Sequence, residues 1–155
     1  MSVRTVAAKF MDLCSRGKHF DFMHGFYAPE MVSVEGNGAE TVGKAAVIRK
    51  SEIFQGSNTI ESQDLRGPFF CGDDRAGSGR FAVYTAIEFS PKAGGARQRH
   101  EEVGLYTVKN DIVTRHIPVC VISTEEARRR ALASGAIAFL AKPLPPRDLL
   151  DEALN

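Results

Sequence analysis

The chain has 155 residues, enough for one domain or for a domain and a fragment. Hydrophobic residues make up 43% and charged residues 25%, so wholesale disorder is excluded. The 20 basic and 19 acidic residues almost cancel, which argues against a nucleic-acid-binding or membrane-coating protein. With no membrane-length apolar run and no signal-peptide core, we expect a cytoplasmic protein.

Apolar spacing predicts three helices in the first third of the chain. Residues 3–14 repeat at helical intervals, and Ser2 is placed to cap this helix. Residues 20–27 continue as a short helix that Pro29 should end, and a third helix is expected over 43–54. A short strand is predicted between the last two, over 31–35, because Gly36 and Gly38 follow it.

The middle of the chain changes to the two-residue period of strands. Residues 58–65, 80–89 and 97–108 alternate, and another strand starts at Ile112 after a tight turn. Gly72, Asp73, Asp74 and Arg75 are interpreted as a turn. Helices followed by an antiparallel meander predict an α+β fold, with the helices on one face of a curved sheet.

After about Thr114 the pattern becomes that of an α/β protein. Residues 118–122 form an apolar run typical of a strand covered on both faces. A helix is predicted from Thr124 to Gly135, then a strand over 137–140 and a last helix from Pro146. We therefore predict two units, residues 1–114 and 115–155.

Cysteines and histidines give no sign of a metal site. Cys14, Cys71 and Cys120 form no CxxC pair, and Cys14 and Cys120 are interpreted as small buried hydrophobes. His19 and His24 have the wrong spacing for two ligands on one helical face. We expect no metal and no cofactor.

Three segments carry a resemblance to a known family over residues 3–113: 26–28 leading into 32–35, 72–75 before 81–83, and 101–108. Together they resemble the SnoaL-like branch of the nuclear transport factor 2-like superfamily. The resemblance implies a cone-shaped fold, a pocket inside the cone, and a homodimer formed through the sheet. Its members include polyketide cyclases, ketosteroid-isomerase-like enzymes and dehydratases.

The tail resembles a different family. Residues 118–124, the helix 125–136 and the segment from Phe139 to Pro143 are similar to the second half of a response-regulator receiver domain. Lys142 and either Ser123 or Thr124 match receiver switch residues, but the acceptor aspartate belongs to the half that is missing. We therefore expect a βαβα fragment that is structural only, from a natural fusion or a chimera.

Polar residues on the inner face of a cone are the candidates for chemistry, because an enclosed pocket shifts pKa values. His100 and Glu102 share one face of a strand about 6.5 Å apart. A histidine and a carboxylate so placed can abstract a proton next to a carbonyl group, and Tyr84 can donate to the developing oxyanion. These three are the predicted catalytic residues. The predicted pocket residues are Glu35, Glu88 and Tyr106.

The function predicted on this basis is an isomerase, cyclase or dehydratase acting on an apolar, carbonyl-bearing small molecule. The alternative is a non-catalytic binding or dimerisation module. A charged run such as residues 97–102 is also typical of a solvated strand end. The two functions differ in one observable respect: if Phe22, Phe54 and Phe81 fill the cone, no substrate enters it.

Overall fold

Helix α1 (Val3–Ser15) begins where the sequence predicts. The computed structural model of the chain describes residues 1–75, 77–123 and 139–141. Ser2 caps α1 through its hydroxyl, which accepts a hydrogen bond from the Thr5 amide at 3.2 Å. The five predicted apolar positions, including Cys14, are all buried. The first helix is therefore confirmed, with its apolar stripe facing the core.

The next elements depart from the prediction around Pro29. Helix α2 (His19–Phe26) ends at Phe26, and strand β1 (Tyr27–Val34) already contains Pro29. A proline fits there because the pairing of β1 with its neighbour is irregular between Tyr27 and Val32. Short strand β2 (Glu40–Val42), which has no sequence prediction, folds back on β1. Helix α3 (Lys44–Ser57) then runs slightly beyond its predicted end.

Two strands, those that begin at Asn58 and Ser78, are longer than their predicted alternating segments. The strands that follow α3 are β3 (Asn58–Arg75), β4 (Ser78–Pro91), β5 (Gln98–Lys109), β6 (Ile112–Ser123) and β7 (Phe139–Ala141). The turn predicted at 72–75 is wrong, because β3 continues to Arg75, although its pairing with β4 is irregular between Cys71 and Arg75. Because Arg75 pairs with Ser78, the turn between β3 and β4 lies between these two residues.

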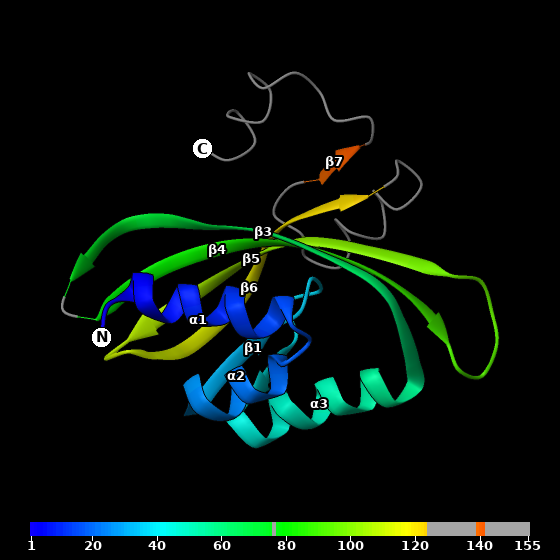
Figure 1. Ribbon diagram of the computed structural model, residues 1–155, viewed down its shortest axis with the longest axis horizontal. Coiled ribbons are helices and arrows are strands. Elements are labelled where there is room, and N and C mark those ends of the chain that lie inside the picture. The colour runs from blue at the N-terminus through cyan, green and yellow to red at the C-terminus, as the bar shows by residue number, and fades with distance from the viewer. Residues whose placement is uncertain (76, 124–138, 142–155) are drawn as a thin grey trace.

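The strands form one curved sheet in the order β2-β1-β6-β5-β4-β3, with β7 added beside β6. The sheet is mixed, which corrects the antiparallel prediction: β1 and β6 run parallel, as do β6 and β7. Figure 1 shows the sheet arching over α1, α2 and α3, which all lie on its concave side. The α+β cone fold is thus confirmed.

The tail joins this sheet. Strand β6 passes through the boundary predicted between residues 114 and 115, and it pairs with β5 as far as Val121. The two predicted tail strands, 118–122 and 137–140, correspond to the end of β6 and to β7, and they are neighbours. Both predicted tail helices lie outside the described residues, as does the side chain of Cys120.

Aromatic side chains fill the inside of the cone. Phe10 lies at its centre, with ring-centroid distances of 5.0 Å to Phe22, 5.8 Å to Phe81 and 4.7 Å to Tyr106. All four are buried. Phe54 is different: it is partly exposed and contacts Phe89 near the end of α3. Two of the three phenylalanines considered as cone-filling residues therefore fill it.

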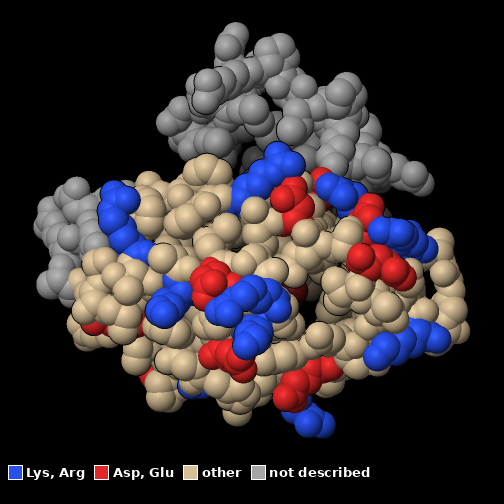
Figure 2. Space-filling view, in the orientation of Figure 1, with Lys and Arg blue, Asp and Glu red and all other residues tan. Residues whose placement is uncertain are grey.

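On the face shown in Figure 2, the described residues form no large surface of a single charge. Figure 2 shows acidic and basic side chains interspersed on the viewed face. None of the helices in the described part of the chain combines the length and apolar character that a membrane crossing needs.

Candidate functional site

A small pocket of about 110 Å³ lies on the concave side of the sheet, between the end of β1 and the strands β5 and β6. Its walls are Ser33, Val34, Glu35, Gly36, His100, Glu102, His116 and Pro118. Most of these side chains are polar, in contrast to the aromatic interior beneath them. The pocket is therefore a polar cup above a filled core.

Strand register brings these side chains together. His100 and Glu102 are two residues apart on β5 and face the same side. Across the β5–β6 hairpin, His116 is paired with Tyr106, and its ring stacks on Tyr106 at 4.6 Å. The parallel pairing of β1 with β6 places Ser33 beside His116. Residues distant in sequence thus meet through two adjacent strand pairs.

Glu102 is held between two histidines. Its Oε2 lies 3.1 Å from Nε2 of His100, and its Oε1 lies 3.3 Å from Nε2 of His116. The exposed fractions are 22% for Glu102, 16% for His116 and 49% for His100. One carboxylate therefore orients two imidazoles, and the His100 ring reaches toward solvent.

The pKa values in this group follow from burial and pairing. Burial alone would raise the pKa of Glu102, but the hydrogen bond with His100, the contact with His116 and the charges of these two rings hold it well below the usual range. For His100, the hydrogen bond to Glu102 raises the pKa, and it outweighs the opposing effect of burial. Glu102 is consequently an anion at neutral pH, and His100 titrates above an ordinary histidine.

Gly104 makes room for His116. A Cβ atom at Gly104 would lie 2.6 Å from Nε2 of His116, closer than real contacts allow. Any larger residue there would force the imidazole away from Glu102. The glycine is thus part of the site's construction, although it has no side chain.

At the rim, Glu35 forms an ion pair with Lys50 of α3. Burial lowers the pKa of Lys50, while the negative charge of Glu102 acts in the opposite direction. Helix α3 therefore supplies a cation beside a cup that is otherwise formed by strands.

The floor of the cup carries protonated groups. Burial raises the pKa of Cys14 to about 12, and it raises the pKa values of Tyr27 and Tyr106 well above the usual range. Nearby negative charge from Glu102 adds to the effect on both tyrosines. These groups stay neutral at physiological pH, so they support the site as packed structure.

The structure separates the six predicted site residues. His100, Glu102 and Glu35 line the pocket, and Tyr106 lies under His116. Tyr84 and Glu88 differ from the expectation, because both lie on the opposite face of the sheet. Tyr84 pairs with Val103, whereas Glu102 is opposite Thr85, so Tyr84 and Glu102 project to different sides.

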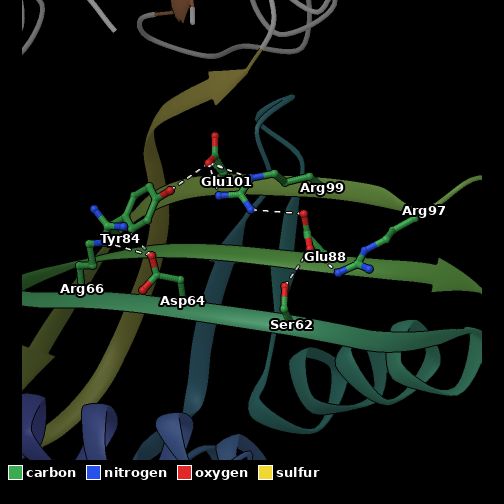
Figure 3. Close-up of polar contacts among 8 residues, drawn as sticks. All are labelled: Ser62, Asp64, Arg66, Tyr84, Glu88, Arg97, Arg99 and Glu101. Atoms are coloured by element: carbon green, nitrogen blue, oxygen red, sulfur yellow. Dashed lines mark hydrogen bonds and ion pairs between the residues drawn. The ribbon is translucent and has the colours of Figure 1, made fainter. Parts of the chain in front are cut away.

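On that outer face, Tyr84 and Glu88 belong to an outer polar network. Tyr84 donates to Oε1 of Glu101 at 3.0 Å, and Arg99 lies 2.7 Å from the same oxygen. Glu88 accepts from Ser62 at 3.0 Å and pairs with Arg97. Figure 3 shows these side chains, with Asp64 and Arg66, on the side of the sheet away from the helices. They hold neighbouring strands together outside the cone.

Sequence reasoning missed Ser33, Lys50 and His116 as site residues. For His116, the signal was available: a tight turn at residues 109–111 aligns β6 against β5, which brings His116 close to Tyr106. For Ser33 and Lys50 no local signal exists, because only the pairing of β1 with β6 and the packing of α3 bring them near the cup.

Within the described residues, no three His, Cys, Asp or Glu side chains gather in a way that could bind a metal ion. The Nε2 atoms of His100 and His116 instead contact the carboxylate of Glu102. A carboxylate paired with imidazoles can transfer protons and form hydrogen bonds.

Solved structures show what the chain is similar to. A candidate SnoaL-like polyketide cyclase from Mesorhizobium loti is 31% identical, and the match covers 75% of this chain and 97% of that one, with a TM-score of 0.66. The chain belongs to the SnoaL-like family. No family model and no curated protein matches the sequence.

More distant structures share the fold of this SnoaL-like chain. A nuclear transport factor 2-like protein of unknown function from Exiguobacterium is 16% identical, with coverages of 73% and 97% and a TM-score of 0.56. A ketosteroid isomerase-like protein from Erwinia carotovora is 12% identical, with coverages of 74% and 89% and the same TM-score. At these identities the comparison concerns the fold alone.

Proposed function

We propose that this SnoaL-like chain transfers protons next to the carbonyl group of a small molecule, as an isomerase, cyclase or dehydratase does. The observation that carries the proposal is the placement of Glu102 between His100 and His116. A carboxylate that fixes an imidazole, whose pKa lies near the working pH, is a common arrangement for general acid–base catalysis.

His100 is the proposed catalytic base. Because the anionic Glu102 accepts from Nε2, the neutral ring carries its proton there and leaves Nδ1 with a free lone pair. Nδ1 takes the proton from the carbon beside the carbonyl group. The C–H electron pair forms the new carbon–carbon double bond, and the carbonyl π electrons move to oxygen to give an enolate. Return of the proton to carbon completes the exchange.

The remaining groups of the cup hold His100 in position and stabilise the charges that form during the reaction. Glu102 fixes the tautomer of His100 and compensates the charge that the ring gains. His116 holds the second oxygen of Glu102 in place. The hydroxyl group of Ser33, on the opposite wall, can donate a hydrogen bond to the developing enolate oxygen.

Hydrogen–deuterium exchange at carbon tests the proposal directly. Small ketones are incubated with the protein in D₂O, and the loss of the α-proton signal is followed by NMR. His100→Gln should lower the catalysed rate about 100-fold. His24→Gln, on the exposed side of α2, is the matched control and should leave the rate unchanged. Equal rates for wild type and His100→Gln would contradict the proposal.

A non-catalytic binding or dimerisation module remains the second candidate, because aromatic rings fill the cone. In this function the cup binds a ligand without turning it over, and the chain forms a homodimer in the cytoplasm. Ligand binding without exchange would favour it. Sedimentation would measure the dimer.

We further propose that the receiver-like tail, residues 115–155, is structural and serves the cone. Support comes from β6, since Pro118, Cys120 and Val121 pair with β5 beside Gly104, Val103 and Glu102. Deleting residues 118–155 removes this pairing, so we expect an insoluble or molten product. A soluble truncated protein with an unchanged melting transition would contradict this role.

A further inference from the structure

We infer that the ligand of the cup is a small, neutral carbonyl compound that carries a hydroxyl group, and not the bulky apolar molecule that the sequence predicts. The inference deepens the proposed function and rests on it, because it names the substrate class of the same site. Four properties of the described residues carry it: the volume of the cup, its solid floor, the balance of its charges and the polar groups of its walls.

The volume sets an upper limit on size. An apolar cavity of about 150 Å³ is enough for benzene, and the cup offers about 110 Å³. Roughly four or five non-hydrogen atoms therefore fit inside it. A fused ring system would have most of its surface outside, whereas binding sites usually bury most of their ligand.

The floor prevents a larger molecule from sinking deeper. The ring of His116 lies on Tyr106, and Tyr106 in turn stacks on Phe81 at 5.1 Å and meets Phe10 at 4.7 Å. These rings are buried in one continuous cluster. Opening the cone to a fused ring system would require several of them to move together, which close packing resists.

The charges of the cup disfavour an ionic ligand of either sign. Glu102 is held as an anion, so an anionic ligand is repelled there, while Glu35 and Lys50 compensate each other as an ion pair. His100, whose pKa the bond to Glu102 raises, opposes a cation when its ring is protonated. A neutral ligand meets neither penalty.

The walls favour hydroxyl groups over hydrocarbon. Carboxylate oxygens at the rim accept hydrogen bonds, and Ser33 both donates and accepts. Val34 and Pro118, together with carbon atoms of the other lining residues, supply the apolar part of the wall. An apolar ligand would leave the Ser33 hydroxyl without the hydrogen bond that a ligand hydroxyl group can supply, and burying an unpaired polar group is costly.

Four probes of one chemical class separate size, polarity and charge. Hydroxyacetone is the reference; butanone replaces its hydroxyl group by a methyl group of similar size; pyruvate carries a negative charge; β-tetralone is a bulky fused ring. Binding of each is measured by saturation-transfer NMR on the full chain, and carbon exchange in D₂O is measured on the same samples. We expect hydroxyacetone to bind at least about tenfold more tightly than each of the others, a difference of about 1.4 kcal/mol.

A variant of the wall ties this preference to the cup. Ser33→Ala should weaken hydroxyacetone binding more than butanone binding, because the Ser33 hydroxyl can bond to the carbonyl oxygen and to the hydroxyl group of hydroxyacetone but only to the carbonyl oxygen of butanone. Ser62→Ala, in the outer polar network, is the matched control and should change neither. A thermal melt confirms that both variants are folded.

The outcomes distinguish the inferred ligand class from the proposed proton-transfer function. Tetralone, butanone or pyruvate binding as tightly as hydroxyacetone overturns the inference, and so does the absence of hydroxyacetone binding. Selective binding of hydroxyacetone with no exchange, or with exchange that His100→Gln does not reduce, overturns the proposed function and leaves the ligand class supported.

Discussion

Two neighbouring glutamates of β5 show how the faces of the sheet differ. Glu101 points outward, with 5% of its side chain exposed, and its carboxylate accepts from Tyr84 and Arg99. Glu102 points into the cone and faces two histidines. Both carboxylates are paired, and both are largely removed from solvent.

The difference lies in the partners. Arginine keeps its charge at any physiological pH, so the bond between Arg99 and Glu101 is permanent and structural. Imidazole gains and loses a proton near neutrality, so His100 is suited to the proton transfer proposed for it. Burial of a charged pair therefore does not by itself indicate a catalytic role on β5. The two glutamates differ because the partner of Glu102 titrates near neutral pH and the partner of Glu101 does not.

The largest expected effect follows from removing the inner carboxylate. Glu102→Gln keeps the size of the side chain but loses the charge that orients His100, so carbon exchange should fall about 100-fold or more. Exchange is followed by NMR in D₂O, with a thermal melt as the folding control. A variant that keeps the wild-type rate would remove the proposed distinction between the two glutamates.

Gly104→Ala tests the inner face without changing any polar group. The new methyl group would overlap with His116, so we expect about a tenfold loss of exchange and about 1–3 kcal/mol of destabilisation. Gly25→Ala is the control, because a Cβ there meets nothing within 4 Å. Wild-type exchange in Gly104→Ala would show that the position of His116 is unimportant.

The outer carboxylate should matter for stability alone. Glu101→Gln weakens its bond with Arg99 and should lower the free energy of unfolding by about 1–2 kcal/mol, measured with urea. Carbon exchange should remain at the wild-type rate. If exchange fell as it does in Glu102→Gln, both faces of β5 would have to contribute to the chemistry.

A smaller effect is expected for Tyr84→Phe, which deletes one hydrogen bond to Glu101. Loss of about 0.5–1.5 kcal/mol in the free energy of unfolding is expected, with no change in exchange. A loss of exchange with intact stability would instead return Tyr84 to the catalytic role that the sequence predicts.

The mildest test follows the titration of His100 by NMR. Its midpoint should lie above pH 6.5 in the wild type, because the bond to Glu102 raises the pKa. In Glu102→Gln the midpoint should move down, since burial then acts with less opposition. The stabilisation from this pair is complete below pH 6.5 and is lost as the pH rises through the folded pKa. A midpoint at or below 6.5 in the wild type would contradict the pairing.

The sequence predicts most of the fold because local patterns determine it. The helical spacing of Val3, Val6 and Phe10 defines α1, and the alternation from Phe81 to Phe89 defines the centre of β4. Pro29 and the 72–75 segment mislead, because an irregular strand pairing accepts residues that usually mark ends and turns. Local propensity gives way to tertiary pairing at these positions.

Local sequence patterns predict only part of the candidate site. The two-residue spacing on β5 correctly joins His100 and Glu102 on one face. Alternation alone does not say which face of β4 joins them, and Tyr84 was therefore placed with the wrong neighbours. Only the pairing of Thr85 with Glu102 fixes that choice. Contacts such as Ser33 with His116 depend on sheet order, which no local pattern contains.

The parallel pairing of β1 with β6 also has a consequence for how the protein folds. Ser33 and His116 stand at opposite ends of the cone sequence, so their side of the cup exists only after β6 has been synthesised and has entered the sheet. Contacts of such long sequence separation form late and slowly. Until then β1 has an open edge that invites wrong pairing. Acquisition of carbon exchange during refolding would therefore report the moment at which the two ends of the cone meet.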